Sequence, residues 1–183
     1  MKADLIELLC KRVAENAAGT TALRNQGAPG VIKAAKNYLK ALDLSDFSAS
    51  SEKIFYMALD KHTDAMTKRF PLNARNWGAA RKCLNLFLRD VAYNYYLAQH
   101  YGFRRLEEWL EIPMDSYVAN GIRHDIRKIL CSDPSECLPK WPGIKHLKPE
   151  ENHAYQVSAS LIAKSLGYAR VHLDIRYWRN LGL

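Results

Sequence analysis

The chain of 183 residues has little of what marks a membrane or secreted protein. No apolar run approaches the ~20 residues that a transmembrane helix needs. Cysteines are few and scattered, and no secretory leader precedes them; they are Cys10, Cys83, Cys131 and Cys137. These absences predict reduced thiols and a soluble, cytoplasmic protein that makes no membrane contact.

Strand-like alternation of apolar and polar residues is nearly absent, and there is no internal repeat or low-complexity segment. Apolar residues recur at helical spacing, which predicts an all-α fold, and the proline-rich stretch 131–149 is expected to be a loop. Helices are expected at about 5–19, 31–42, 51–70, 79–100, 104–110, 115–130, 150–166 and 171–181. The helix 79–100, the longest and most apolar, is expected to be central.

Acidic residues are outnumbered: the 27 lysines and arginines against 19 aspartates and glutamates give a formal charge of +8. Such a balance suits a polyanionic partner, because neutralising phosphates releases counterions. The expected partner is double-stranded DNA, which would make the protein nucleoid-associated. The length fits one domain, or two small helical lobes, with a core that needs no disulfide or metal.

Two segments place a lysine at the start of one long helix and an aspartate at the start of the next. The first runs from Trp77 to Arg89 and holds Lys82; the second, Ile112-Pro113-Met114-Asp115, opens the following helix. The first turn of a helix disfavours a protonated ammonium, which suits an amine nucleophile. A polar stripe on the first helix, expected to face a cleft, contains Lys82, Asn85, Arg89 and Tyr93.

These segments resemble the active-site signature of the helix-hairpin-helix DNA glycosylase superfamily. Its pattern is roughly Leu-Pro-Gly-x-Gly-x-Lys-Thr-Ala, a helix, then Asp-Thr/Ser-His. The residues that match are Gly78, Lys82, Asn85, Asp115, Ser116 and Val118, whereas Ala80 replaces the second hairpin glycine and Tyr117 the usual histidine. The wide separation of Lys82 and Asp115 is similar to that in the archaeal 8-oxoguanine glycosylase branch.

The resemblance implies a two-lobed helical helix-hairpin-helix DNA glycosylase fold with the active site in the cleft between the lobes. The whole chain, 1–183, would be one such domain, with a central lobe at about 31–130 and a second lobe formed by 1–30 together with 131–183. A monomer is expected. Members with an iron–sulfur cluster hold it on four closely spaced cysteines, which Cys131 and Cys137 cannot supply, so neither a metal nor another cofactor is expected.

The resemblance also assigns roles to residues. Lys82 would be the nucleophile and Asp115 the carboxylate that stabilises the sugar cation. Contacts to DNA would come from the hairpin residues Trp77, Gly78, Ala80 and Arg81, and from Gln26, which would fill the gap left by an extruded base. The base pocket would be lined by Asn85, Tyr117, Asp174 and Trp178.

Each residue also has a structural interpretation. Lys82 could be a solvated lysine at a helix start, Asp115 an N-cap, the segment 76–80 a plain turn between helices, and Gln26 a surface glutamine. The leading function is a bifunctional glycosylase that excises 8-oxoguanine. Alternatives are excision of a modified cytosine from bacteriophage DNA as a defence, a non-catalytic helix-hairpin-helix DNA-binding module, and a helical scaffold for an acidic protein.

Overall fold

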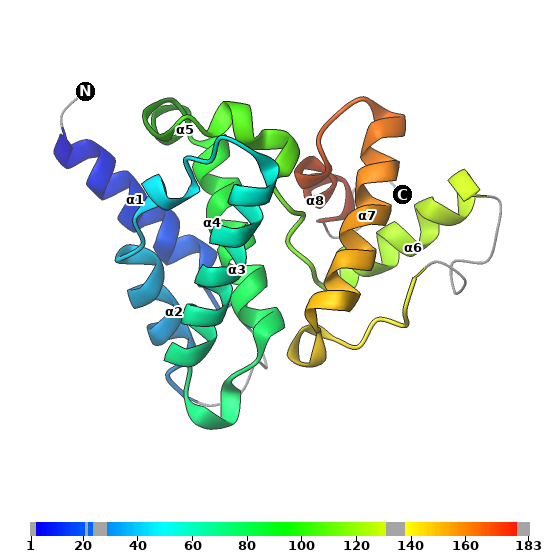
Figure 1. Cartoon of the computed structure of the whole chain (residues 1–183). Helices are drawn as coiled ribbons and strands as arrows, with labels where there is room; N and C mark the ends of the chain where they lie inside the picture. Colours follow the sequence, from blue (N-terminus) through cyan, green and yellow to red (C-terminus); the bar gives the residue numbers. More distant parts are fainter. Residues whose placement is uncertain (1–2, 21, 24–28, 131–137, 179–183) are drawn as a thin grey trace.

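A computed structural model describes residues 3–20, 22–23, 29–130 and 138–178. Within these ranges every regular element is a helix, so the predicted all-α class is confirmed. None of the helices in this part of the chain is long and apolar enough to cross a bilayer. The buried apolar side chains form two clusters. The helices lie in two corresponding groups, α1 to α5 (residues 3–101) and α6 to α8 (residues 116–177) (Figure 1).

The first core is built from the chain up to Leu110, with Ala169 and Val171 added from the far end. Its elements are α1 (Ala3–Ala17), α2 (Val31–Lys40), α3 (Glu52–Arg69), α4 (Trp77–Tyr93), α5 (Tyr95–Tyr101) and three short 3-10 turns, η1 (Leu44–Phe47), η2 (Leu72–Ala74) and η3 (Phe103–Trp109). The N-cap of α3 is Ser51, whose Oγ accepts from the backbone N–H of Ile54 at 3.4 Å. α4 is the central element, because α1, α2, α3 and α5 all pack against it (Figure 1).

The second core starts at Ile112 and ends at Tyr177. Its elements are α6 (Ser116–Leu130), α7 (Pro149–Leu166), α8 (Leu173–Tyr177), and the turns η5 (Ile144–His146) and η6 (Arg170–His172). α6 packs closely on α8: a Cβ added to Gly121 would lie 2.2 Å from the ring of Tyr177. Only glycine therefore allows this approach of the two helices.

The two cores divide the chain differently from the expected lobes. The N-terminal helix was expected to join residues 131–183, but Ile6 and Val13 of α1 belong to the first core. α6 was expected in the central lobe, but Val118 and Ile122 belong to the second core. The main passage from the first core to the second is at Glu111, and Ala169 and Val171 return briefly to the first core. The correction follows from which apolar stripes pack together.

The long helix expected at 79–100 is two helices. Asn94 ends α4 and begins α5: its N–H donates to carbonyls of α4, and its Oδ1 accepts from the N–H groups of Tyr96 and Leu97, both at 3.1 Å. An asparagine side chain competes in this way with the helical backbone bonds. The helix expected at about 104–110 is present as the 3-10 helix η3, which has 7 residues, and α4 begins at Trp77 rather than at Ala79.

Candidate active site

The polar stripe predicted on α4 faces the second core and the segments that lead to it. Each of its members has a partner across this junction: Lys82 with Asp115, Asn85 with Glu111, Arg89 with Asp174, and Tyr93 with His172. The residues that the sequence singled out on this helix are thus brought together with Asp115 and Asp174. The stripe itself was predicted, but its partners, apart from Asp115, were not.

Lys82 and Asp115 meet as predicted. The Nζ of Lys82 lies 3.2 Å from Oδ2 of Asp115, and the lysine is only 7% exposed. Because α4 begins at Trp77, however, Lys82 lies in the second turn of the helix and not in the first. The field of the helix N-terminus fades within the first turn, so the expected help from the macrodipole is largely lost. The carboxylate of Asp115 is the electrostatic partner instead.

Asp115 has two tasks, one for each oxygen. Oδ1 accepts from the backbone N–H groups of Tyr117 and Val118, both at 3.0 Å, and so caps α6. Oδ2 points to Lys82. The two backbone bonds fix the plane of the carboxylate, and its side chain is 28% exposed. The N-cap interpretation of Asp115 is therefore confirmed, and the cap leaves Oδ2 available for chemistry.

A second ion pair lies near the first. Arg89 bonds Asp174 and also contacts Asp90 at 2.6 Å. Burial raises the pKa of the Asp174 carboxyl; Arg89 opposes this, and the negative charge of Asp115 adds to it. Asp174 is therefore within electrostatic reach of the Lys82–Asp115 pair, as its expected place in the pocket requires. Its side chain is held by Arg89 and is mostly buried.

The expected DNA contacts on the first turn of α4 need correction. Gly78 and Ala80 are buried, and a Cβ on Gly78 would lie 2.2 Å from the carbonyl oxygen of Ile144 and 2.8 Å from Cβ of Leu147. η5 thus covers the segment that was expected to hold phosphate. The N–H of Ala79 is bonded within the protein to Oδ1 of Asn76, at 3.2 Å. The segment therefore packs inside the protein and does not present its amides to DNA.

Arg81 was also expected to contact DNA, but the residue is only 4% exposed. Nε and Nη2 donate to the two oxygens of Glu111, each at 2.9 Å, and Nη1 donates to Asp60 at 2.8 Å. Its Cζ lies 5.1 Å from the ring centroid of half-buried Trp77. These interactions make Arg81 a structural residue and place Trp77 beside it.

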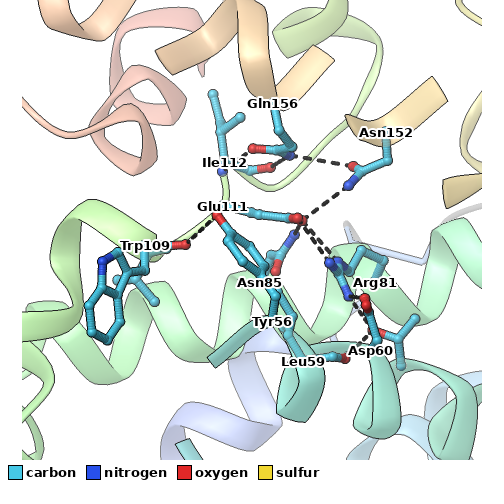
Figure 2. A network of polar contacts seen from close by, with 12 residues as sticks. Tyr56, Leu59, Asp60, Arg81, Asn85, Trp109, Glu111, Ile112, Asn152 and Gln156 are labelled. Atoms are coloured by element: carbon cyan, nitrogen blue, oxygen red, sulfur yellow. Dashed lines mark hydrogen bonds and ion pairs between the residues drawn. The ribbon is translucent and has the colours of Figure 1, made fainter. Parts of the chain in front are cut away.

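Glu111 is the hub of this network, and the sequence analysis missed it (Figure 2). Besides Arg81, it accepts from Asn85 Nδ2 at 2.9 Å and from Asn152 Nδ2 at 3.2 Å. Burial by itself raises the pKa of Glu111, but the charge and hydrogen bonds of Arg81 lower it to about 2. The hub joins α4, α7 and the connection between the cores. Nothing local in the sequence marks it, because its partners are distant along the chain.

Asn85 was assigned to the base pocket, but its amide faces Glu111. The residue is 3% exposed, and its Oδ1 has no hydrogen-bond partner among the described residues. Tyr117 and Trp178 are about half exposed, at the start of α6 and just after α8. Of the four expected pocket residues, these two are exposed.

A cavity of about 550 Å³ lies beside the Glu111 network, between α3 and α7. Its walls include Tyr56 and Asp60 of α3 and Val157 and Leu161 of α7. Lys82 and Asp115 are not among its lining residues. This cavity therefore lies on the Arg81 side of α4, and the lysine–aspartate pair is not part of it.

Three expectations concern metals, cysteines and Gln26. In the ranges that the structure describes, no group of three or more His, Cys, Asp or Glu side chains is placed to hold a metal ion. Cys10 and Cys83 are free thiols, and burial raises the pKa of Cys83 to about 12, so this thiol is unreactive. Gln26, Cys131 and Cys137 lie outside the described residues.

Comparison of the chain with protein-family models, with curated proteins and with solved structures finds no match, so the resemblance to the glycosylase superfamily depends on the motifs and on the geometry of this site.

Proposed function

We propose that the protein is a DNA glycosylase whose nucleophile is Lys82, with Asp115 as its carboxylate partner. The observation that carries the proposal is their contact: two residues chosen by motif, distant along the chain, lie 3.2 Å apart where the two cores meet. A surface lysine or a plain N-cap would not require this pairing. In the proposed fold, the two cores correspond to the two lobes of a helix-hairpin-helix glycosylase.

In the proposed reaction, the Lys82 ammonium first releases its proton to solvent, and the resulting free amine is the nucleophile. Its Nζ attacks C1′ of an extruded nucleotide, the bond from C1′ to the base nitrogen breaks, and the base leaves with a proton from the new secondary ammonium. Opening of the sugar ring gives a Schiff base between C1′ and Nζ. Loss of a 2′ proton then expels the 3′ phosphate by β-elimination, and water hydrolyses the imine. This sequence is the expected bifunctional activity.

Asp115 supports this chemistry through its fixed Oδ2. The carboxylate stabilises the positive charge that develops at C1′ as the base departs, and it orients Nζ before attack. Because Oδ1 is held by two backbone N–H groups, the carboxylate needs little reorganisation during the reaction. Preorganised charge of this kind is usually the largest catalytic contribution.

The nearly complete burial of Lys82 sets a condition on catalysis. An extruded nucleotide can reach Nζ only if Lys82 and Asp115 separate, or if the segment that leads into α6 moves. The exposed residues Tyr117 and Trp178 are the aromatic side chains proposed to stack on the base, and Asp174 is the polar group near the pair. The leading substrate remains 8-oxoguanine; a modified cytosine of bacteriophage DNA is the alternative.

Borohydride trapping tests the proposal. The wild-type protein is incubated with duplexes that contain 8-oxoguanine, uracil, thymine glycol, 3-methyladenine or a modified cytosine, and a covalent adduct is expected with one of them, first with 8-oxoguanine. Lys82→Gln should abolish the adduct, and Lys53→Gln, at an exposed lysine of α3, should leave it unchanged. Circular dichroism and a melting curve confirm that both variants are folded.

The outcomes separate the alternatives. An adduct with modified cytosine alone would keep the chemistry and replace the substrate. DNA binding without any adduct would favour the non-catalytic DNA-binding module, and full trapping by Lys82→Gln would move the nucleophile to another residue.

A further inference from the structure

The segment that covers the start of α4 is a firmly held strap, defined here as residues 138–148 between α6 and α7 (Figure 1, yellow). Leu138 and Leu147, near its two ends, are buried in the second core. Between them, the carbonyl of Pro139 accepts from Arg123 Nη1 at 2.9 Å and from the hydroxyl of Tyr155 at 3.0 Å. The strap is thus attached to both α6 and α7.

Two further features fix the path of the strap. The ring of Trp141 packs edge-on against Tyr155, with centroids 5.5 Å apart. Gly143 has φ +83°, a conformation that favours glycine, and it turns the chain into η5. Ile144 and Leu147 then close over Gly78. The inner side of the strap is therefore apolar and packed.

The outer side of the strap is basic. Its exposed charged or titratable side chains are Lys140, Lys145, His146 and Lys148, and residues 138–148 contain no acidic residue. Within the described part of the chain, no carboxylate lies in ion-pair range of these three lysines, whereas Lys36 and Lys40 of α2 both pair with Glu15. Of the two glutamates that follow, Glu151 accepts from the backbone N–H of Lys148 at 2.9 Å. The three lysine charges are therefore available to a partner.

The strap also lies close to the proposed nucleophile along α4. Gly78, which it covers, is four residues before Lys82, so the two positions share one face of the helix. The rise of ~1.5 Å per residue puts them about 6 Å apart along the helix axis. A partner held by the strap would therefore be held beside the junction that contains Lys82 and Asp115.

We propose that this strap is the surface that binds the DNA phosphate backbone, in place of the buried first turn of α4. The inference rests on the proposed function, because that function makes duplex DNA the ligand. Three exposed lysines that make no ion pair with any described residue suit phosphate contacts: each is a point charge suited to a phosphate oxygen, and the packed inner side of the strap holds the backbone that carries them. Such contacts position the duplex and carry no sequence information.

The test compares two variants with the same loss of charge. The strap variant is Lys140→Gln/Lys145→Gln/Lys148→Gln. The control is Lys53→Gln/Lys68→Gln/Lys164→Gln, at exposed lysines of α3 and α7. Affinity for an undamaged duplex and for an 8-oxoguanine duplex is measured between low and physiological salt. Each phosphate contact contributes about 0.9 to the slope of log K against log salt, so the strap variant should lose roughly 2.7 from the slope, equally for both duplexes.

The control should keep the wild-type slope, and equal slopes in the two variants would overturn the proposal. Borohydride trapping at saturating DNA is measured in parallel, so that the two hypotheses fail separately. A reduced salt slope without any covalent adduct would support DNA binding by the strap and would refute the proposed glycosylase activity. A covalent adduct together with an unchanged salt slope in the strap variant would refute DNA binding by the strap and leave the glycosylase proposal standing. Vesicles that contain phosphatidylserine are a second probe, and strap-dependent binding to them with an unchanged DNA slope would identify a membrane surface and refute the proposal.

Discussion

Replacing Glu111 by Gln should destabilise the protein strongly, although the two side chains have nearly the same volume. Glu111 accepts four hydrogen bonds, two from Arg81 and one each from Asn85 and Asn152. A glutamine side chain has one acceptor oxygen and one NH₂ group. Its NH₂ group would therefore face N–H donors that a carboxylate oxygen of Glu111 accepts in the wild-type protein. Arg81, 4% exposed, would also lose the partner that neutralises it inside the protein.

Removing one partner of a buried ion pair costs about 3–5 kcal/mol, because the remaining charge is left uncompensated. For a chain of this size, about 2–4 °C of melting temperature corresponds to 1 kcal/mol, so the melting temperature should fall by roughly 10 °C. Asp60→Asn is the matched control, since Asp60 bonds the same guanidinium but its side chain is 65% exposed. An exposed partner contributes about 1 kcal/mol or less, and the control should shift by only a few degrees.

The pH dependence of stability gives a second readout. The pKa of Glu111 is lowered in the folded protein to about 2, from an ordinary value of 4.5. Its contribution is therefore fully present above pH 4.5 and is lost as the pH falls from 4.5 towards 2. Denaturant unfolding at several pH values should show a steeper loss of free energy for wild type than for Glu111→Gln in this window. The reasoning would be refuted if Glu111→Gln and Asp60→Asn lowered the melting temperature equally. It would also be refuted if the unfolding free energies of wild type and Glu111→Gln fell in parallel with pH.

Two further predictions concern the pair and the strap. Asp115→Asn should lower single-turnover base release by orders of magnitude, because an amide can still cap α6 through its oxygen but cannot neutralise a sugar cation; undiminished release per folded molecule would make Asp115 only a cap. Gly78→Ala should lower the free energy of unfolding by about 1–3 kcal/mol, as measured by denaturant unfolding. The new Cβ would overlap the carbonyl oxygen of Ile144, and this overpacking outweighs the gain in helix propensity. If the Gly78→Ala variant were more stable than wild type, residues 138–148 would have to shift away from α4 at little energetic cost.

The sequence predicted well those elements whose apolar stripes are regular. Leu84, Leu88 and Val91 mark the buried side of α4, and all three lie in the first core. Tyr95 continues the same helical spacing, yet it is 58% exposed, because Asn94 interrupts the helix and α5 starts a new direction. Periodicity cannot show such a break when the interrupting side chain supplies its own caps on both sides.

The site was predicted in part for a related reason. A motif carries short-range information, so it identified Lys82 and Asp115 and gave Asp115 its place at a helix start. It did not show what covers Gly78, because the strap lies far along the chain and its inner face is set by tertiary packing. Glu111 was missed in the same way: its carboxylate is explained only by Arg81, Asn85 and Asn152, none of which is near it in sequence.

The two ion pairs where the cores meet, Arg81–Glu111 and Lys82–Asp115, differ in how firmly they are held. Arg81 and Lys82 are consecutive on α4, and their partners, Glu111 and Asp115, lie on one short connection between the cores. The Arg81–Glu111 pair is bidentate, buried on both sides and tied to α7 through Asn152. Lys82 makes one contact to a carboxylate that is partly exposed. Separating Lys82 from Asp115 therefore costs less than separating the cores, and in the proposed mechanism a nucleotide reaches the amine while the Glu111 network keeps the junction intact.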